Sequence, residues 1–264
     1  QVQMKFTGVF YENFCSNGTR DYDQIFFDRL KPEYPDIEFT FLESNLYKET
    51  ASLAAGYDGI CAFVNADLGA EVIEELRHQG IRLILMRCAG YNNVDLKAAA
   101  ENGITVVRVP AYSPYAVAEY TVALMLSQPE DTPRHLAHTR RQLSLHGLLG
   151  FDMYGKTAGI IGTGKIAKKL IAILRGFGMN ILAYDLYPDY NFAREHQVVY
   201  TTLDELYRSS DIISLHCPLT EQTRYLINDY SISKMKDGVM IINTGRGQLI
   251  HTMPDRRTEK QENR

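Results

Sequence analysis

Apolar residues follow two alternating patterns along the first half of the chain. Short runs rich in β-branched residues alternate with stretches in which apolar residues return every three or four positions. The short runs predict strands over residues 4–10, 37–42, 59–64, 82–87 and 104–107. The longer stretches predict helices over residues 22–30, 71–78, 94–101 and 115–126, the last one capped near Ser113. Repeated alternation of this kind is typical of a parallel sheet covered on both faces.

The same rhythm returns in the second half of the chain. Strands are predicted over residues 157–161, 180–184, 198–200, 212–216 and 239–242, and helices over residues 168–175 and 203–207. A polar stretch with two prolines separates the halves and breaks the helix pattern. We therefore predict a first βα domain over residues 1–112, a connecting helix and hinge over 113–143, a second βα domain over 144–251, and a polar tail over 252–264.

Composition and charge narrow the classes of partner. The 264 residues carry a formal net charge of −4, which gives no electrostatic reason to bind nucleic acid or anionic lipid. Apolar runs stay below the roughly 18 residues of a membrane span, and we see no secretory leader. The four cysteines are widely spaced, three of them within apolar runs, so we expect buried free thiols, no metal site and a cytoplasmic protein.

A glycine-rich turn in the second half carries the strongest chemical signal. Gly162, Gly164 and Ala167 form a G-x-G-x-x-A pattern directly after one predicted strand and directly before a helix. Gly162 permits the tight turn, and Gly164 lets the backbone approach a pyrophosphate without a Cβ in the way. Ala167 allows close packing of helix on strand, while the helix N-terminus presents free N–H groups to the phosphates.

Asp185 follows the next predicted strand, 21 residues after Gly164. An acid at about this spacing binds the adenosine ribose of a dinucleotide and repels a 2′-phosphate. The pattern therefore favours NAD over NADP. The alternative is that the glycines serve only the packing of a strand–helix–strand unit.

Several segments, taken in order, resemble the D-isomer-specific 2-hydroxyacid dehydrogenase family, with the D-lactate dehydrogenases as the most similar branch. They are Cys88–Asp95, Val109–Pro114, Ala116–Glu119, Ser144–Gly150, Leu215–Thr220 and Asn243–Gly247. The resemblance implies an α/β fold with two βα domains, a flavodoxin-like substrate domain and an NAD-binding Rossmann domain with a parallel sheet. It also implies hydride transfer between NADH and a small 2-keto acid, with pyruvate and D-lactate as the default pair, by a homodimer.

The resemblance also implies roles for individual residues. The substrate pocket would be lined by Phe63, Ala89, Gly90 and Tyr112. The dinucleotide would contact Gly162, Gly164, Lys165, Ile166, Asp185, Cys217, Pro218, Thr223, Thr244 and Gly245. Arg246 matches the family's arginine, which binds the substrate carboxylate and polarises the keto oxygen. Arginine suits this role because its planar fork binds a carboxylate bidentately and stays charged; the alternative for Arg246 is a structural ion pair.

The family pattern fades after Gly247, where a glutamate and a histidine for acid–base chemistry are expected. We predict that the last strand and the closing helix of the family are missing. Because the glutamate and histidine would be missing as well, the alternative function is a non-catalytic NAD-binding protein or a truncated remnant. His251 is interpreted as a surface histidine, and His216 as a packed or cofactor-adjacent one. His135 and His138 form an H-x-x-H pair without an evident third metal ligand.

Overall fold

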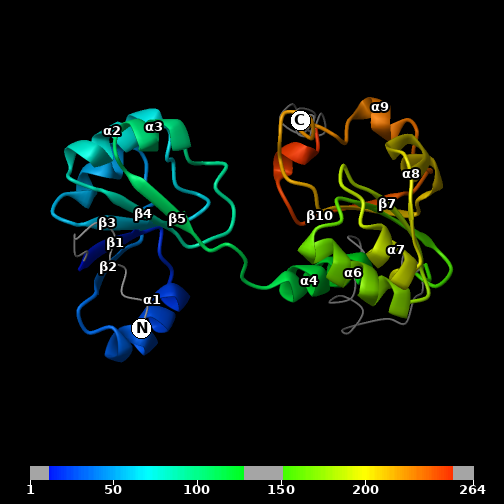
Figure 1. Ribbon diagram of the computed structural model, residues 1–264, viewed down its shortest axis with the longest axis horizontal. Coiled ribbons are helices and arrows are strands. Elements are labelled where there is room, and N and C mark those ends of the chain that lie inside the picture. The colour runs from blue at the N-terminus through cyan, green and yellow to red at the C-terminus, as the bar shows by residue number, and fades with distance from the viewer. Residues whose placement is uncertain (1–11, 128–150, 252–264) are drawn as a thin grey trace, which may run out of the picture. The chain divides into compact units, whose positions relative to one another are not determined.

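The computed structural model describes residues 12–127 and 151–251, and the chain divides into two compact units, Gln1–Tyr112 and Ser113–Arg264 (Figure 1). Each unit is built around a five-stranded parallel sheet, so the predicted α/β class with two βα domains is confirmed. The strand predicted over residues 4–10, most of the predicted hinge and the polar tail lie outside the described residues.

The sheet of the first unit has the strand order β2-β1-β3-β4-β5, which is the flavodoxin-like order. Its strands are β1 (Asn13–Asn17), β2 (Glu38–Leu42), β3 (Gly59–Ala62), β4 (Leu83–Met86) and β5 (Thr105–Arg108). The helices are α1 (Asp21–Leu30), α2 (Ala70–His78) and α3 (Leu96–Glu101), with 3-10 turns at Lys31–Glu33 and Lys48–Ala54. The main core packs α2 and α3 against the sheet, and the Phe27 ring of α1 contacts the rings of Phe39 and Phe41 of β2 at steep angles.

β1 was not predicted, because its sequence, Asn-Phe-Cys-Ser-Asn, lacks a β-branched run. It pairs with β2 on one side and β3 on the other, and its last four residues are all buried. Two neighbouring strands satisfy the backbone groups, which allows polar side chains in a central strand. The expectation for the cysteines is confirmed: all are free thiols, and Cys15, Cys61 and Cys88 are buried.

The sheet of the second unit has the order β10-β9-β6-β7-β8. Its strands are β6 (Thr157–Ile161), β7 (Asn180–Tyr184), β8 (Val198–Tyr200), β9 (Ile212–Leu215) and β10 (Met240–Asn243). The helices are α4 (Pro114–Leu126), α6 (Lys165–Gly176), α7 (Tyr190–His196), α8 (Leu203–Ser209) and α9 (Asp229–Ile232), with a 3-10 turn at Gly247–Leu249. Separate cores cover the two faces: one includes α4, α6 and α7, and the other includes α8.

The predicted cap of α4 is confirmed, because the Ser113 hydroxyl accepts a hydrogen bond from the Ala116 backbone N–H at 3.2 Å. α4 has 13 residues, whereas a membrane span needs about 20. Across residues 12–127 and 151–251, no helix is both long and apolar enough to cross a membrane.

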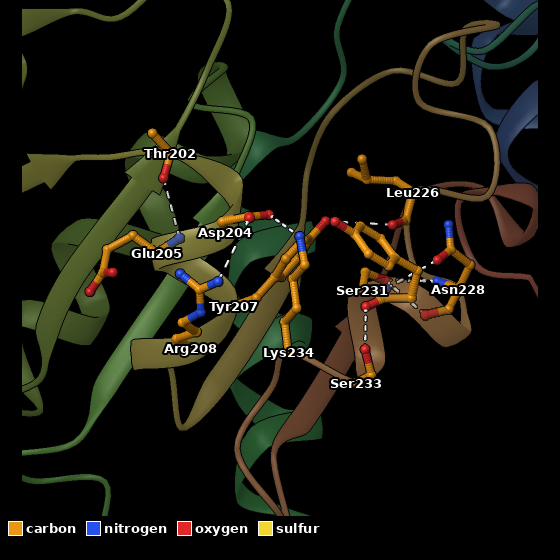
Figure 2. Close-up of polar contacts among 11 residues, drawn as sticks. Thr202, Asp204, Glu205, Tyr207, Arg208, Leu226, Asn228, Ser231, Ser233 and Lys234 are labelled. Carbon is orange, nitrogen blue, oxygen red and sulfur yellow. Dashed lines mark hydrogen bonds and ion pairs between the residues drawn. The ribbon is translucent and has the colours of Figure 1, made fainter.

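A cluster of polar side chains joins α8 to the segment that contains α9 (Figure 2). The Lys234 ammonium lies 2.6 Å from the Asp204 carboxylate and 3.9 Å from the centroid of the Tyr230 ring. The Tyr207 hydroxyl donates to the Leu226 carbonyl at 3.5 Å (Figure 2). The hydrogen bond from Lys234 holds the pKa of Asp204 below its usual value, so the contact is charged at neutral pH.

Candidate functional site

The turn after β6 requires glycine at position 162. The φ angle of Gly162 is +91°, which L-residues rarely adopt. A Cβ added there would lie 2.6 Å from the Cys217 backbone nitrogen, so the turn and the end of β9 are in close backbone contact. The Gly162 N–H donates to the Tyr184 carbonyl at 2.8 Å, which ties the turn to the end of β7.

The space in front of α6 is open. A Cβ built at Gly164, the N-cap of this helix, would meet no atom within 4 Å, and no side chain caps the helix. The first N–H groups of α6, beginning at Lys165 and Ile166, therefore have no side-chain acceptor at the N-cap. On the opposite side, Ala167 is fully buried against the sheet core. An open approach to free N–H groups at a positive helix end fits the pyrophosphate of a dinucleotide.

Asp185 follows β7 and turns its carboxylate onto the glycine-rich turn. Its Oδ2 accepts hydrogen bonds from the Thr163 backbone N–H at 2.5 Å and from the Thr163 hydroxyl at 2.8 Å, and its Oδ1 accepts one from the Tyr187 N–H at 2.9 Å. Burial raises the pKa of Asp185, but the bonds from Thr163 and Tyr187 outweigh it and bring the pKa below its usual value. Asp185 is therefore ionised at neutral pH.

The end of β9 lies beside the same turn. β6 pairs with β7 on one side and with β9 on the other, so the strand order reverses at β6, the position at which open α/β sheets bind ligands. Cys217 and Pro218 follow β9, and the Thr223 hydroxyl donates to the Pro218 carbonyl at 2.6 Å. Three of the predicted cofactor residues are thus carried by one locally bonded loop.

Asn243, the last residue of β10, holds the turn that follows the strand through its side chain. The Nδ2 of its side chain donates to the Arg246 backbone carbonyl at 2.9 Å, and the Oδ1 of the same side chain accepts from the Gly245 N–H at 2.9 Å. The Thr244 hydroxyl lies 3.2 Å from the hydroxyl of Thr121 on α4. Thr244, Gly245 and Arg246 therefore sit on a compact turn at the carboxyl end of the sheet, and the Arg246 side chain is half-buried.

His216 agrees with the interpretation as a packed histidine. Its Nε2 lies 2.8 Å from the hydroxyl of Ser214, and its backbone N–H donates to the Ile161 carbonyl. Burial lowers the pKa of His216 to about 4, so the imidazole is neutral at physiological pH.

The residues predicted for the substrate pocket belong to the first unit. Phe63 follows β3, and Ala89 and Gly90 follow β4, which pairs with β3, so these residues share the carboxyl edge of the sheet. Tyr112 ends the unit, and 69% of its surface is exposed.

Arg87, at the end of β4, is a residue of this region that the sequence analysis did not single out. Its guanidinium lies 5.3 Å from the centroid of the Phe63 ring and 2.6 Å from the Asp23 carboxylate. It also donates to the carbonyls of Asn17 and Gly18. An arginine inside a strand run was a signal that could have found it, since a charge at a buried position needs a partner.

Thr163 and Tyr200 were also missed. The Tyr200 hydroxyl, at the end of β8, donates to the Thr163 hydroxyl at 2.9 Å. A hydroxyl residue between the two glycines was visible in the sequence, but its partner, 37 positions away, was not. His251 is exposed as expected, and its ring contacts Tyr225 at 4.8 Å. His135 and His138 lie outside the described residues.

The chain is similar in sequence to known proteins of one family. The model of the D-isomer specific 2-hydroxyacid dehydrogenase NAD-binding domain matches residues 122–253. D-lactate dehydrogenase of Escherichia coli is 47% identical over 233 residues, which are 88% of this chain and 70% of that protein. A 2-hydroxyacid dehydrogenase homolog of Haemophilus influenzae is 47% identical over 235 residues, 89% of this chain and 70% of the relative.

Solved structures of D-lactate dehydrogenases are also similar to this chain. The apo-structure of D-lactate dehydrogenase from Escherichia coli matches with a TM-score of 0.83 at 46% identity, and it covers 90% of this chain and 75% of that one. D-lactate dehydrogenase from Aquifex aeolicus, complexed with NAD and lactic acid, matches with a TM-score of 0.76 at 32% identity, covering 90% and 70%. The chain therefore belongs to the D-isomer-specific 2-hydroxyacid dehydrogenase family, and its cofactor is NAD.

Proposed function

We propose that the protein reduces a small 2-keto acid with NADH to the D-2-hydroxy acid, with pyruvate and D-lactate as the preferred pair. The net reaction consumes one NADH and one proton and yields one NAD⁺. The choice of pyruvate is supported by relatives that are D-lactate dehydrogenases in Escherichia coli and Aquifex aeolicus. In this proposal the protein acts as a homodimer in the cytoplasm, residues 1–112 bind the substrate, residues 113–143 connect, and residues 144–251 bind NAD.

The observation that carries the proposal is the turn after β6. Gly162 fills a position that no Cβ could occupy, Gly164 opens the approach to α6, and Asp185 is held on the same turn by Thr163. We assign the pyrophosphate to the N–H groups of Gly164, Lys165 and Ile166.

We assign the rest of the dinucleotide to the carboxyl edge of the same sheet. The residues assigned to it, beyond the pyrophosphate turn, are Asp185, Cys217, Pro218, Thr223, Thr244 and Gly245. Asp185 takes the adenosine ribose, because an ionised carboxylate is the acceptor that a ribose hydroxyl needs.

Arg246 is the residue of this chain that we assign to the chemistry. NADH, when bound, supplies the hydride that reduces the keto carbon. The Arg246 guanidinium binds the substrate carboxylate and stabilises the negative charge that develops on the keto oxygen. The two hydrogen bonds of the Asn243 side chain hold the backbone of this turn, from which the Arg246 side chain extends. From the resemblance to the family, we assign Phe63, Ala89, Gly90 and Tyr112 of the first unit to substrate binding.

The test is NADH titration followed by turnover, with pyruvate and 2-ketoisocaproate as substrates. We expect NADH binding, oxidation of NADH with pyruvate, and a lower kcat/KM with the bulkier acid. Arg246→Lys should lower kcat/KM by about 10²-fold or more while NADH affinity is retained, because the bidentate charge contact is lost. Arg194→Ala, which removes an exposed arginine of α7, is the control and should leave both values unchanged.

Each failure has a separate meaning. NADH binding without oxidation of any 2-keto acid would refute dehydrogenation and support a non-catalytic NAD-binding role. Turnover that Arg246→Lys leaves unchanged would refute the role of Arg246 alone. The absence of NADH binding would refute the assignment of the turn after β6.

A further inference from the structure

A chain of hydrogen bonds ends on the carboxylate of Asp185. The Asp189 backbone N–H donates to the Tyr200 hydroxyl at 3.1 Å, the Tyr200 hydroxyl donates to the Thr163 hydroxyl at 2.9 Å, and the Thr163 hydroxyl donates to Asp185 Oδ2 at 2.8 Å. We call these four residues the ribose relay.

The direction of the relay is determined by its two ends. An ionised carboxylate only accepts hydrogen bonds, so the single hydroxyl proton of Thr163 points to Asp185. Thr163 then accepts the proton of Tyr200, and Tyr200 accepts the backbone N–H of Asp189, which can only donate. Hydrogen bonds aligned in one direction polarise one another, and the last of them is charge-assisted.

The relay is anchored on three elements. Thr163, in the turn after β6, is only 5% exposed. Tyr200 ends β8, and its ring meets that of Tyr190 edge to face at 5.7 Å. Asp189 caps α7 by accepting from the Phe192 N–H at 3.0 Å, and its carboxylate pairs with Lys168 at 2.5 Å. The donors therefore cannot follow Asp185 if its side chain rotates.

Two donors of Thr163 converge on the same oxygen of Asp185. Together with the bond from Tyr187 to Oδ1, they set the plane of the carboxylate relative to the glycine-rich turn. A carboxylate held in one orientation loses no rotamer freedom when a ribose binds, and it cannot turn away from a 2′-phosphate. The Lys168 charge, which could favour that phosphate, is compensated by Asp189.

We propose that Tyr200, acting through Thr163, is a positioning residue for Asp185 and so sets the preference for NAD over NADP. This inference rests on the proposed role of Asp185 at the adenosine ribose. Tyr200 contributes by orientation, because its hydroxyl is bonded to Thr163 and Asp189.

The test compares Tyr200→Phe, Thr163→Val and the double variant, with Kd values for NADH and NADPH measured by fluorescence titration. One lost hydrogen bond in the relay should raise the Kd for NADH about threefold to tenfold. The preference for NADH over NADPH should fall by a similar factor. The double variant should be no weaker than Thr163→Val, because Tyr200 acts only through that hydroxyl. Thr163→Ser, which keeps the hydroxyl, should stay close to the parent.

Tyr207→Phe is the matched control, since it also removes a hydrogen-bonded tyrosine hydroxyl from this unit, and it should change neither Kd. A folded Tyr200→Phe protein with the parental Kd values and cofactor preference would overturn the proposal. So would strictly additive effects in the double variant. If Tyr200→Phe does not fold, the comparison of Thr163→Val with Thr163→Ser decides. Failure of the parent to bind NADH would remove the proposed function itself, which separates that failure from a failure of the relay alone.

Discussion

Acidification should destabilise the second unit through His216, whose side chain is packed at the end of β9. In the folded protein burial lowers the pKa of His216 to about 4, whereas the histidine of an unfolded chain titrates near its usual pKa of 6.5. Between these two values the unfolded state binds more protons than the folded state, so stability falls as pH falls through this window. At pH 7.5 and above the imidazole is almost entirely neutral in both states and has little effect on stability.

The magnitude follows from the two pKa values. Between pH 7.5 and pH 5 the difference in proton binding costs about 2 kcal/mol, and the loss approaches about 3 kcal/mol below pH 4. The hydrogen-bonded aspartates act at lower pH. The pKa values of Asp185, Asp189, Asp204 and Asp211 lie below the usual 3.8, so the stability that they contribute is lost only as pH falls below about 4.

The assay is urea unfolding of the parent and of His216→Gln at pH 7.5 and pH 5. The glutamine keeps a polar partner for Ser214 but does not titrate, so the parent should lose about 2 kcal/mol more than the variant over this interval. His78→Gln, which removes an exposed histidine of α2, is the control and should follow the parent. An identical pH dependence in the parent and in His216→Gln would refute the reasoning.

Two further predictions concern close contacts. Gly162→Ala should destabilise the protein by more than about 1 kcal/mol and abolish NADH binding, because it combines a positive φ with a Cβ 2.6 Å from a backbone atom. Gly155 also has a positive φ, but a Cβ there would meet open space, so Gly155→Ala measures the backbone strain without the steric clash. An equal loss of stability in both variants by thermal unfolding would contradict a clash at Gly162. Asp23→Asn should cost about 3 kcal/mol, because it leaves the Arg87 charge, 10% exposed, without its carboxylate. The double variant Asp23→Leu with Arg87→Met, which removes both charges, should recover most of that loss in chemical denaturation. A double variant as unstable as Asp23→Asn would contradict the idea that the loss comes from an unpaired buried charge.

The strands and the glycine-rich turn of the candidate cofactor site could be predicted from the sequence because their signals are local. The bounds of β6, β7 and β8 agree with the predicted runs, and the glycine-rich turn follows β6 as expected. A positive φ demands glycine whatever the rest of the fold does, and a β-branched run favours a strand before it has a partner. The assignment of NAD rested on these local features and was confirmed by the family.

Only the tertiary structure could decide the features that depend on distant partners. β1 is a strand because β2 and β3 satisfy its backbone on both sides, not because of its own residues. The protonation of His216 depends on how the folded chain buries it. Thr163 meets Tyr200, and Arg87 meets Asp23, only after parallel strands have been placed side by side. Periodicity encodes which face of an element is buried, but it carries no information about which side chain will lie across the sheet, and that pairing decides the electrostatics of this site.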